Sequence, residues 1–131
     1  MSYLFDSSTI FKAVKENAVE VLAGNFTLDL TRYELGNILW KEYTLNKRIS
    51  REESKKLVKI IKDVLDLLET LTISCNEEEI LGIADSLKIT FYDASYVYQA
   101  KKNKIPLVTE DLELMNKAKP QIKTLELNNL I

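Results

Sequence analysis

Four acidic residues follow or interrupt short apolar runs, at points where a strand is expected to end or a helix to begin. Asp6 follows "YLF", Asp111 follows "PLVTE", and Glu34 and Asp93 stand within "TRYELGN" and "FYDASYVY". Carboxylates gathered at one place repel one another unless a cation offsets their charge. Such a cluster suits Mg²⁺ or Mn²⁺, which prefer oxygen ligands and activate water for attack on a phosphodiester.

The composition leaves carboxylates to carry any hydrolytic chemistry. The chain has no histidine and a single cysteine, Cys75. The absence of histidine excludes Ser/His and Cys/His nucleophile pairs and histidine zinc sites, and one thiol is too few for a thiolate metal site. Cys75 cannot form an internal disulfide, and a buried packing role is predicted for it. Hydrolysis would therefore depend on acids, alone or through a hard metal ion.

The length and composition predict one globular domain over residues 1–131. The chain has 46% apolar and 29% charged residues, with few prolines and glycines. It lacks a secretory start and any apolar run near the roughly 20 residues that span a bilayer, so we expect a cytoplasmic location and no membrane role. The net charge of −2 predicts no broad basic surface for nucleic acid. Lys101, Lys102 and Lys104 form a local basic run that either contacts phosphates or is simply a solvated face.

Strand-like and helix-like segments alternate along the chain. Strands are expected over 2–5, 24–30, 70–74, 105–109 and 121–127, and helices over 7–16, 31–47, 50–69, 76–88, 92–103 and 111–119. This order predicts an α/β fold with a mainly parallel central sheet and helices on both faces. The short connection at 46–49 predicts that the second and third helices form a helical hairpin.

The helix starts relate the acids to the predicted sheet. Ser50 and Glu53 match a capping box, Asn76 is a candidate cap, and Thr31 is a candidate N-cap that places Glu34 in the first turn of its helix. Taken singly, an acid at a helix start is explained as a cap or as a complement to the helix dipole. Strand ends and the helix starts that follow them share one edge of a parallel sheet, so the acids are also able to converge there.

The segments "YLFDSSTIFK", "RYELGNILWK" and "FYDASYVYQAKKNKIPLVTEDLEL" resemble the successive acidic motifs of the PIN-domain ribonucleases, particularly the VapC-type toxins of toxin–antitoxin pairs. The resemblance spans nearly the whole chain. It implies a single PIN-like domain that acts as a metal-dependent endoribonuclease, hydrolysing RNA with a metal-activated water. No acid of the family's quartet is missing.

The resemblance also implies roles for particular residues. The catalytic and metal-holding acids would be Asp6, Glu34, Asp93 and Asp111, with Mg²⁺ or Mn²⁺ as cofactor. Thr109 and Ser8 match hydroxyl residues that support these acids, although a turn or cap bond explains each of them equally well. Similar proteins are homodimers inhibited by a small VapB-like antitoxin. The surfaces expected to make these contacts are the arm that carries Trp40 and Tyr43 and the helix at 50–69.

Two other functions remain open from the sequence. A receiver-like signalling module also has a parallel α/β fold with strand-end acids, but it needs an adjacent acid pair after the first strand, and "LFDSS" has only one acid. A PIN nuclease of RNA processing, outside a toxin pair, is less easily separated. Tyr92, Tyr96 and Tyr98 are candidates for base stacking, although their spacing on a helix requires at least one of them to face the core.

Overall fold

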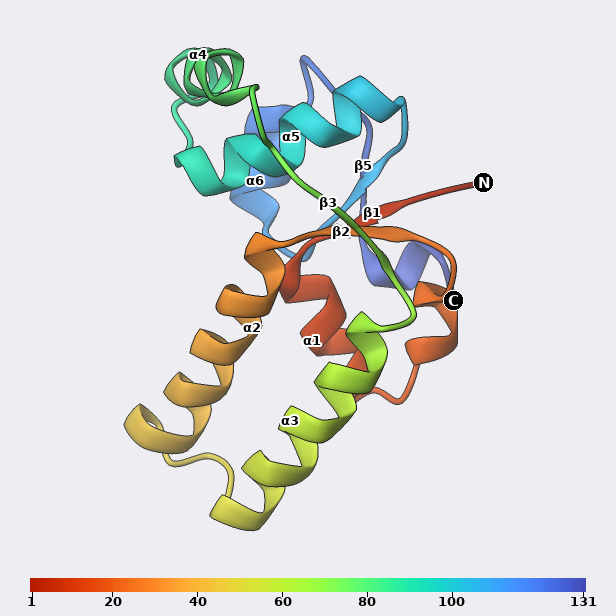
Figure 1. Cartoon of the computed structure of the whole chain (residues 1–131), viewed down its shortest axis with the longest axis vertical. Helices are drawn as coiled ribbons and strands as arrows, with labels where there is room; N and C mark the ends of the chain where they lie inside the picture. Colours follow the sequence, from red (N-terminus) through yellow and green to blue (C-terminus); the bar gives the residue numbers. More distant parts are fainter.

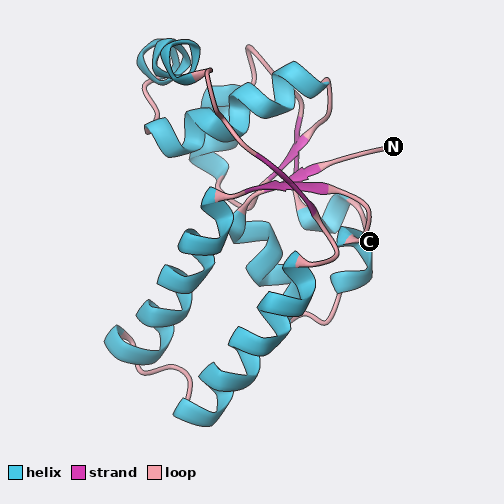
Figure 2. Cartoon of the chain, viewed as in Figure 1, coloured by secondary structure: helices cyan, strands magenta, loops and turns pink.

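The computed structural model describes all 131 residues, as a five-stranded sheet between two groups of helices (Figures 1 and 2). The strands are β1 (Leu4–Phe5), β2 (Phe26–Leu28), β3 (Glu69–Leu71), β4 (Leu107–Val108) and β5 (Thr124–Leu125). The helices are α1 (Ser7–Lys15), α2 (Leu30–Trp40), α3 (Arg51–Leu65), α4 (Glu77–Leu87), α5 (Phe91–Asn103) and α6 (Leu112–Ala118). Shorter helical segments are η1 (Val19–Leu22), the π-helical η2 (Lys41–Leu45) and η3 (Leu127–Asn129). None of the helices is both long and apolar enough to cross a bilayer.

The sheet is parallel throughout, with the strand order β3-β2-β1-β4-β5. This confirms the predicted α/β fold. The order reverses direction between β1 and β4, where Leu4 pairs with Leu107 and Phe5 with Val108. In sheets of this kind the crevice beyond the carboxyl ends at the reversal point is the usual ligand site. The fold therefore directs attention to the residues that follow β1 and β4.

Neighbouring residues of the central strands pack into different cores. Leu4 and Leu107 belong to a cluster with residues of α4, α5 and α6, whereas Phe5 and Val108 belong to a cluster with residues of α1, α2 and α3. Successive side chains of a strand point to opposite faces, so two-residue strands that are fully buried serve both cores. Figure 1 shows α4, α5 and α6 above the sheet and α1, α2 and α3 below it.

The helical hairpin is present, with α2 continuing through η2 before the chain turns back into α3. Ser50 and Glu53 form the predicted capping box at the start of α3, with both reciprocal bonds at 3.1 Å. The inner side of the hairpin contributes Leu35, Leu39, Ile61 and Val64 to the core. Its tip leaves Trp40 48% exposed and Leu45 58% exposed.

Three local predictions were wrong. Thr31 does not cap α2, because Asp29 takes that position and Thr31 is buried with its hydroxyl bonded to other side chains. Asn76 stands at the N-cap of α4, but its side chain makes no cap bond and accepts a hydrogen bond from the Tyr98 hydroxyl at 2.7 Å instead. Cys75 is exposed rather than buried, in a turn where its φ of +69° is left-handed.

Candidate active site

Asp6 is held at the junction between β1 and α1. It is the N-cap of α1, and its Oδ1 accepts hydrogen bonds from the Thr9 amide at 3.0 Å and the Ser8 hydroxyl at 2.7 Å. Its Oδ2 accepts a short hydrogen bond from the Thr109 hydroxyl. Only 6% of the residue is exposed, and this burial raises the pKa of Asp6 to about 6 despite the three hydrogen bonds that oppose the rise. The nearby Asp93 raises the pKa of Asp6 further.

Thr109 joins the acid that follows β1 to the acid that follows β4. Its hydroxyl donates to Asp6 and accepts from the Asp111 amide at 3.1 Å. Asp111 is the N-cap of α6, where its Oδ1 accepts from the amides of Glu113 and Leu114 at 3.0 and 3.2 Å. Its other carboxylate oxygen makes no hydrogen bond, so it is available to a ligand.

Glu34 enters the same region from α2. The helix begins at Leu30, so Glu34 lies in its second turn and not in the first, as Thr31 capping had implied. The Tyr96 hydroxyl donates to Glu34 Oε1 at 2.6 Å, and Thr31 lies 2.6 Å from the same hydroxyl. Partial burial raises the pKa of Glu34, the Tyr96 bond opposes the rise, and the charge of Asp6 adds to it. Tyr96 therefore positions an acid and is 1% exposed, which excludes it from base stacking.

Asp93 is the third residue of α5, and its amide donates to the Thr90 hydroxyl at 3.0 Å. Partial burial raises the pKa of Asp93, and the charges of Asp111 and Glu34 raise it further. The carboxylates of Asp6, Glu34, Asp93 and Asp111 thus act on one another although they belong to four different helices or their N-caps. In Figure 1 α1 and α2 begin close together at the edge of the sheet, and α5 begins above them on the left.

The donor set fits a hard divalent cation in its chemistry. All four groups are carboxylates. Burial raises the pKa values of Asp6, Glu34 and Asp93, and repulsion from a neighbouring acid raises each of them further, which is a situation that a cation relieves. As they stand, no three acidic side chains form a ready-made group for a metal ion. A cation would have to draw the carboxylates of this edge closer together.

Two hollows flank the acids. One, of about 190 Å³, is lined by Asp93, Asp111 and Glu113 together with Lys88 and Lys117. The other, of about 570 Å³, is lined by Glu34 and by Leu30, Tyr33, Asn37 and Tyr92. The acidic edge therefore opens to the surface on a lysine-containing side and on a tyrosine-containing side.

The predicted basic run lies elsewhere. Lys101, Lys102 and Lys104 stand at the end of α5, and Lys101 lies eight positions after Asp93, about 12 Å further along the helix axis. Lys101 and Lys104 line a different hollow, beside Pro106, the residue before β4. The lysines that share a hollow with the predicted acids are Lys88 and Lys117, which the sequence analysis did not select.

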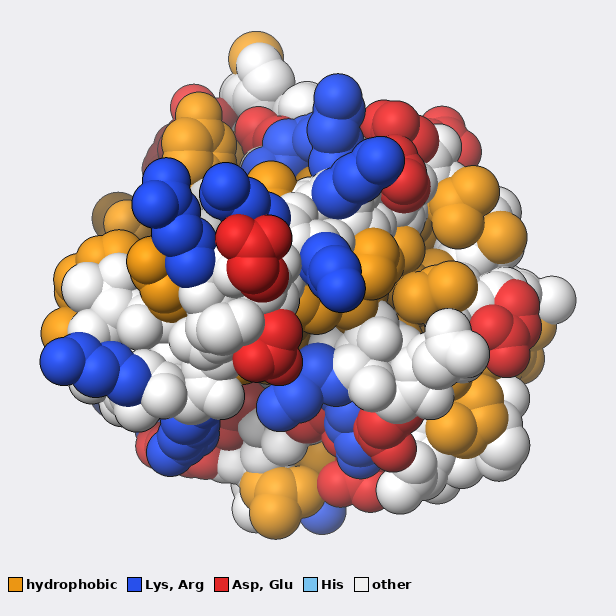
Figure 3. All heavy atoms as spheres, turned by 90° about the horizontal axis from the view of Figure 1, so that it is seen from below, with side chains coloured by type: hydrophobic (Ala, Val, Ile, Leu, Met, Phe, Trp, Pro, Cys, Tyr) orange, Lys and Arg blue, Asp and Glu red, His pale blue; other side chains and the backbone are white.

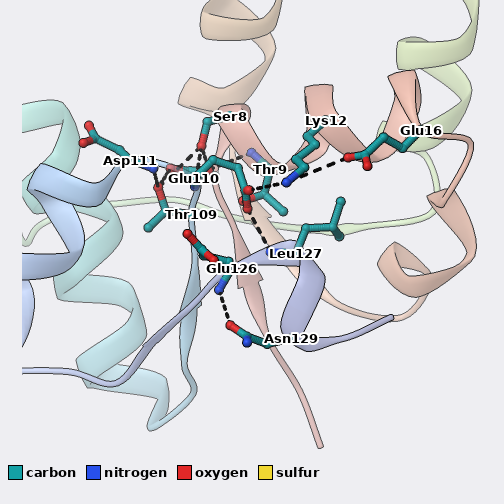
Figure 4. A network of polar contacts seen from close by, with 11 residues as sticks. Ser8, Thr9, Lys12, Glu16, Thr109, Glu110, Asp111, Glu126, Leu127 and Asn129 are labelled. Atoms are coloured by element: carbon teal, nitrogen blue, oxygen red, sulfur yellow. Dashed lines mark hydrogen bonds and ion pairs between the residues drawn. The ribbon is translucent and has the colours of Figure 1, made fainter.

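Glu110 links the loop that carries Asp111 to neighbouring elements through hydrogen bonds, and it was not predicted from the sequence. Its Oε1 accepts from Lys12 at 2.9 Å, and its Oε2 accepts from the Leu127 amide at 2.8 Å and weakly from Thr9 at 3.4 Å (Figure 4). Its own amide donates to the Ser8 hydroxyl at 3.0 Å. Glu110 thereby joins the loop after β4 to α1 and η3, while Asp111 points away from this network. Its place directly before Asp111 was the one available signal.

Replacing Glu110 with Ala is expected to destabilise the protein by about 1–3 kcal/mol, because the buried Leu127 amide loses its acceptor. Urea denaturation of the two proteins measures the difference. Glu16→Ala is the matched control, since Glu16 lies 3.9 Å from the same lysine, Lys12, but is largely solvated. Equal stabilities of the Glu110 and Glu16 variants would contradict a structural role for Glu110.

The chain belongs to the PIN domain family, whose model matches residues 1–120. It is a homologue of VapC proteins: it is 36% identical over 129 residues to "Exonuclease VapC9" of Pyrobaculum aerophilum, covering 93% of this chain and 90% of the relative.

Solved structures agree with this assignment. The crystal structure of PAE2754 from Pyrobaculum aerophilum superposes with a TM-score of 0.81 at 32% identity, over 99% of this chain and 95% of the other. VapBC2 from Rickettsia felis, solved bound to a DNA fragment from its promoter, has a TM-score of 0.66 at 18% identity, over 96% and 98% of the two chains. At that identity the second comparison supports the fold alone.

Proposed function

We propose that this PIN-domain protein is a metal-dependent endoribonuclease that acts as the toxin of a VapBC-type pair. The observation that carries the proposal is the placement of Asp6, Glu34, Asp93 and Asp111 at one edge of the sheet, where the strand order reverses and their charges act on one another. Membership of the PIN family and similarity to a relative named as a nuclease support it. The receiver-like alternative has no support in the comparisons.

The four carboxylates would hold Mg²⁺ or Mn²⁺, which supplies an activated water and neutralises charge on the phosphate. Asp6 and Asp111 would bind from the two central strand ends, with the Thr109 hydroxyl fixing their relative positions. Ser8 would orient the other oxygen of Asp6 through its 2.7 Å bond. Glu34 and Asp93 would close the site from α2 and α5, and the Tyr96 hydroxyl would hold Glu34 in place.

The name of the Pyrobaculum aerophilum relative favours a second candidate, an exonuclease, which requires a free strand end. The two hollows argue for internal cleavage. Because one opens beside Glu34 and the other beside Asp93 and Asp111, a strand is able to continue past the acids in both directions. In-line attack by the activated water would leave a 5′-phosphate on the product.

A circular single-stranded RNA separates the two candidates, since it has no end for an exonuclease. We expect the purified protein to linearise it in Mn²⁺ and to be inactive in EDTA, with cleavage followed on denaturing gels. A linear RNA and single-stranded DNA of the same sequence serve as controls. Degradation of the linear RNA without cutting of the circle would favour the exonuclease. No cleavage of any of these substrates in Mn²⁺ or Mg²⁺ would contradict the proposed nuclease.

The proposal extends to partners and setting. A homodimer and a VapB-like antitoxin are expected, as is a cytoplasmic place of action for a single domain over 1–131. The exposed apolar side chains at the tip of the hairpin, Trp40, Tyr43 and Leu45, favour it as one contact surface. Figure 3 shows basic and acidic side chains interspersed with apolar ones on the face seen from below, so RNA contacts are expected to be local.

A further inference from the structure

The hollow beside Glu34 has walls suited to an aromatic ligand. Leu30, Tyr33, Glu34 and Asn37 are spaced i, i+3, i+4 and i+7, so they form one stripe along α2. Such a stripe normally faces a core, yet Tyr33 is 81% exposed. Tyr92, at the start of α5, lines the same hollow and is 59% exposed. Two solvated tyrosine rings from different helices therefore share one opening.

Each tyrosine directly precedes a predicted catalytic acid. Tyr33 is followed by Glu34 and Tyr92 by Asp93. Glu34 itself lines the hollow, so a ligand that occupies the hollow would lie against one of the four acids. The volume of about 570 Å³ lies within the range of roughly 300–1,000 Å³ that is usual for ligand pockets.

The charge of the hollow decides which part of a nucleotide it takes. Glu34 is its one charged residue, so a phosphate would be repelled there. A nucleobase is uncharged, presents a flat π-face to tyrosine rings, and offers edge groups to the Asn37 amide. The hollow on the other side of the acids contains Lys88 and Lys117 beside Asp93, Asp111 and Glu113, so it is the one of the two hollows that offers cations to a phosphate.

We propose that Tyr33 and Tyr92 form a base-stacking subsite for an unpaired nucleotide of single-stranded RNA, next to the bond that is cut. This inference rests on the proposed function, since it gives the same site its substrate class. Of the tyrosines that the sequence offered on α5, Tyr92 is the one available for stacking, because Tyr96 and Tyr98 are 1% and 7% exposed.

The test measures binding apart from cleavage. The full chain carrying Asp93→Asn, which is expected not to turn over, is titrated against single-stranded oligouridylates with one 2-aminopurine at successive positions. We expect binding to quench the fluorescence at one preferred position, as stacking does. Adding Tyr33→Ala or Tyr92→Ala should remove that quenching and weaken binding about 5- to 150-fold, the range expected for one lost base stack.

Matched variants separate stacking from a general loss of structure. Tyr33→Phe and Tyr92→Phe keep the rings and should keep the quenching. Leu81→Ala, at a 61% exposed side chain on α4 outside both hollows, should change nothing. Because both tyrosines are solvated, the alanine variants should unfold at the same temperature as the parent.

The outcomes distinguish the subsite from the proposed function. The subsite is overturned if the quenching is unchanged by both alanine substitutions, or if the protein binds no RNA at all. The hollow would then suit a segment of a protein partner. If the wild-type protein still cuts RNA in that case, the proposed nuclease stands. If the quenching depends on the tyrosines but the wild-type protein cuts no RNA, the subsite is supported and the proposed nuclease function is contradicted.

Discussion

Asp93→Asn is expected to lower RNA cleavage by more than about 100-fold while leaving the fold intact. Removing a residue that only orients a metal ligand typically lowers metal affinity or activity by roughly 10–100-fold. Removing a proposed ligand itself should therefore lower the activity further. Asp93 is the acid whose carboxylate interacts with those of Asp6, Glu34 and Asp111, which makes it central to the cluster. The start of α5 should survive, because Thr90 accepts from the backbone amide of residue 93 and not from its side chain.

The measurement is the initial rate of cleavage of a labelled single-stranded RNA in Mn²⁺, with circular dichroism to check the fold. Asp85→Asn is the matched control, since it removes one carboxylate from an exposed position on α4, paired with Lys88 at 3.4 Å. It should cut RNA at the wild-type rate. Undiminished cleavage by the purified Asp93→Asn protein would show that Asp93 has no catalytic role.

The sequence was sufficient for the order of the elements and for the edge at which the acids lie. Apolar runs followed by Asp6 or by Asp111 identify strand ends, because a buried strand must stop where a charged group begins. A parallel sheet then brings such ends to one edge. The resemblance to PIN ribonucleases selected the same four acids, and the family match agrees with it. What the acids do there remains a prediction.

The supporting network was beyond sequence reasoning because its contacts are distant along the chain. Glu110 bonds to Lys12, 98 residues away, and Tyr96 bonds to Glu34, 62 residues away. No local pattern distinguishes such a glutamate or tyrosine from a solvated one. The same holds for Thr31. Thr31 and Asp29 are both suitable N-cap residues for α2, and only the contact between Thr31 and the buried Tyr96 shows that Asp29 is the cap. The strands were also shorter than predicted, since pairing, and not apolar character, sets their ends.

Burial of the Asp6 carboxylate, together with the nearby charge of Asp93, should make the metal-free protein less stable as pH rises. Asp6 has a pKa of about 6 in the folded chain and 3.8 as the reference value, so the folded state binds more protons between these values. Stability therefore falls as pH rises from about 4 to about 6, and the loss persists above that range. A shift of about two units corresponds to about 3 kcal/mol at neutral pH.

Asp6→Asn should remove this loss, because the amide stays neutral and still bonds to its neighbours. Its oxygen is able to accept from Thr9 and Ser8, and its NH₂ group to donate to the Thr109 hydroxyl. Urea denaturation in EDTA should therefore find the variant more stable than wild type at pH 7.5 and nearly equal to it at pH 4. Asp85→Asn should not show this pattern.

Addition of Mn²⁺ at pH 7.5 should reverse the order of the two proteins. A cation that binds the folded state stabilises it by mass action, and the wild-type carboxylate is the better ligand. The metal should therefore raise the unfolding midpoint of wild type and change that of Asp6→Asn little. A variant that is less stable than wild type in EDTA at pH 7.5 would mean that the Asp6 carboxylate is a structural cap whose hydrogen bonds outweigh its burial. Stabilisation by Mn²⁺ that is equal in both proteins would instead locate the ion away from Asp6.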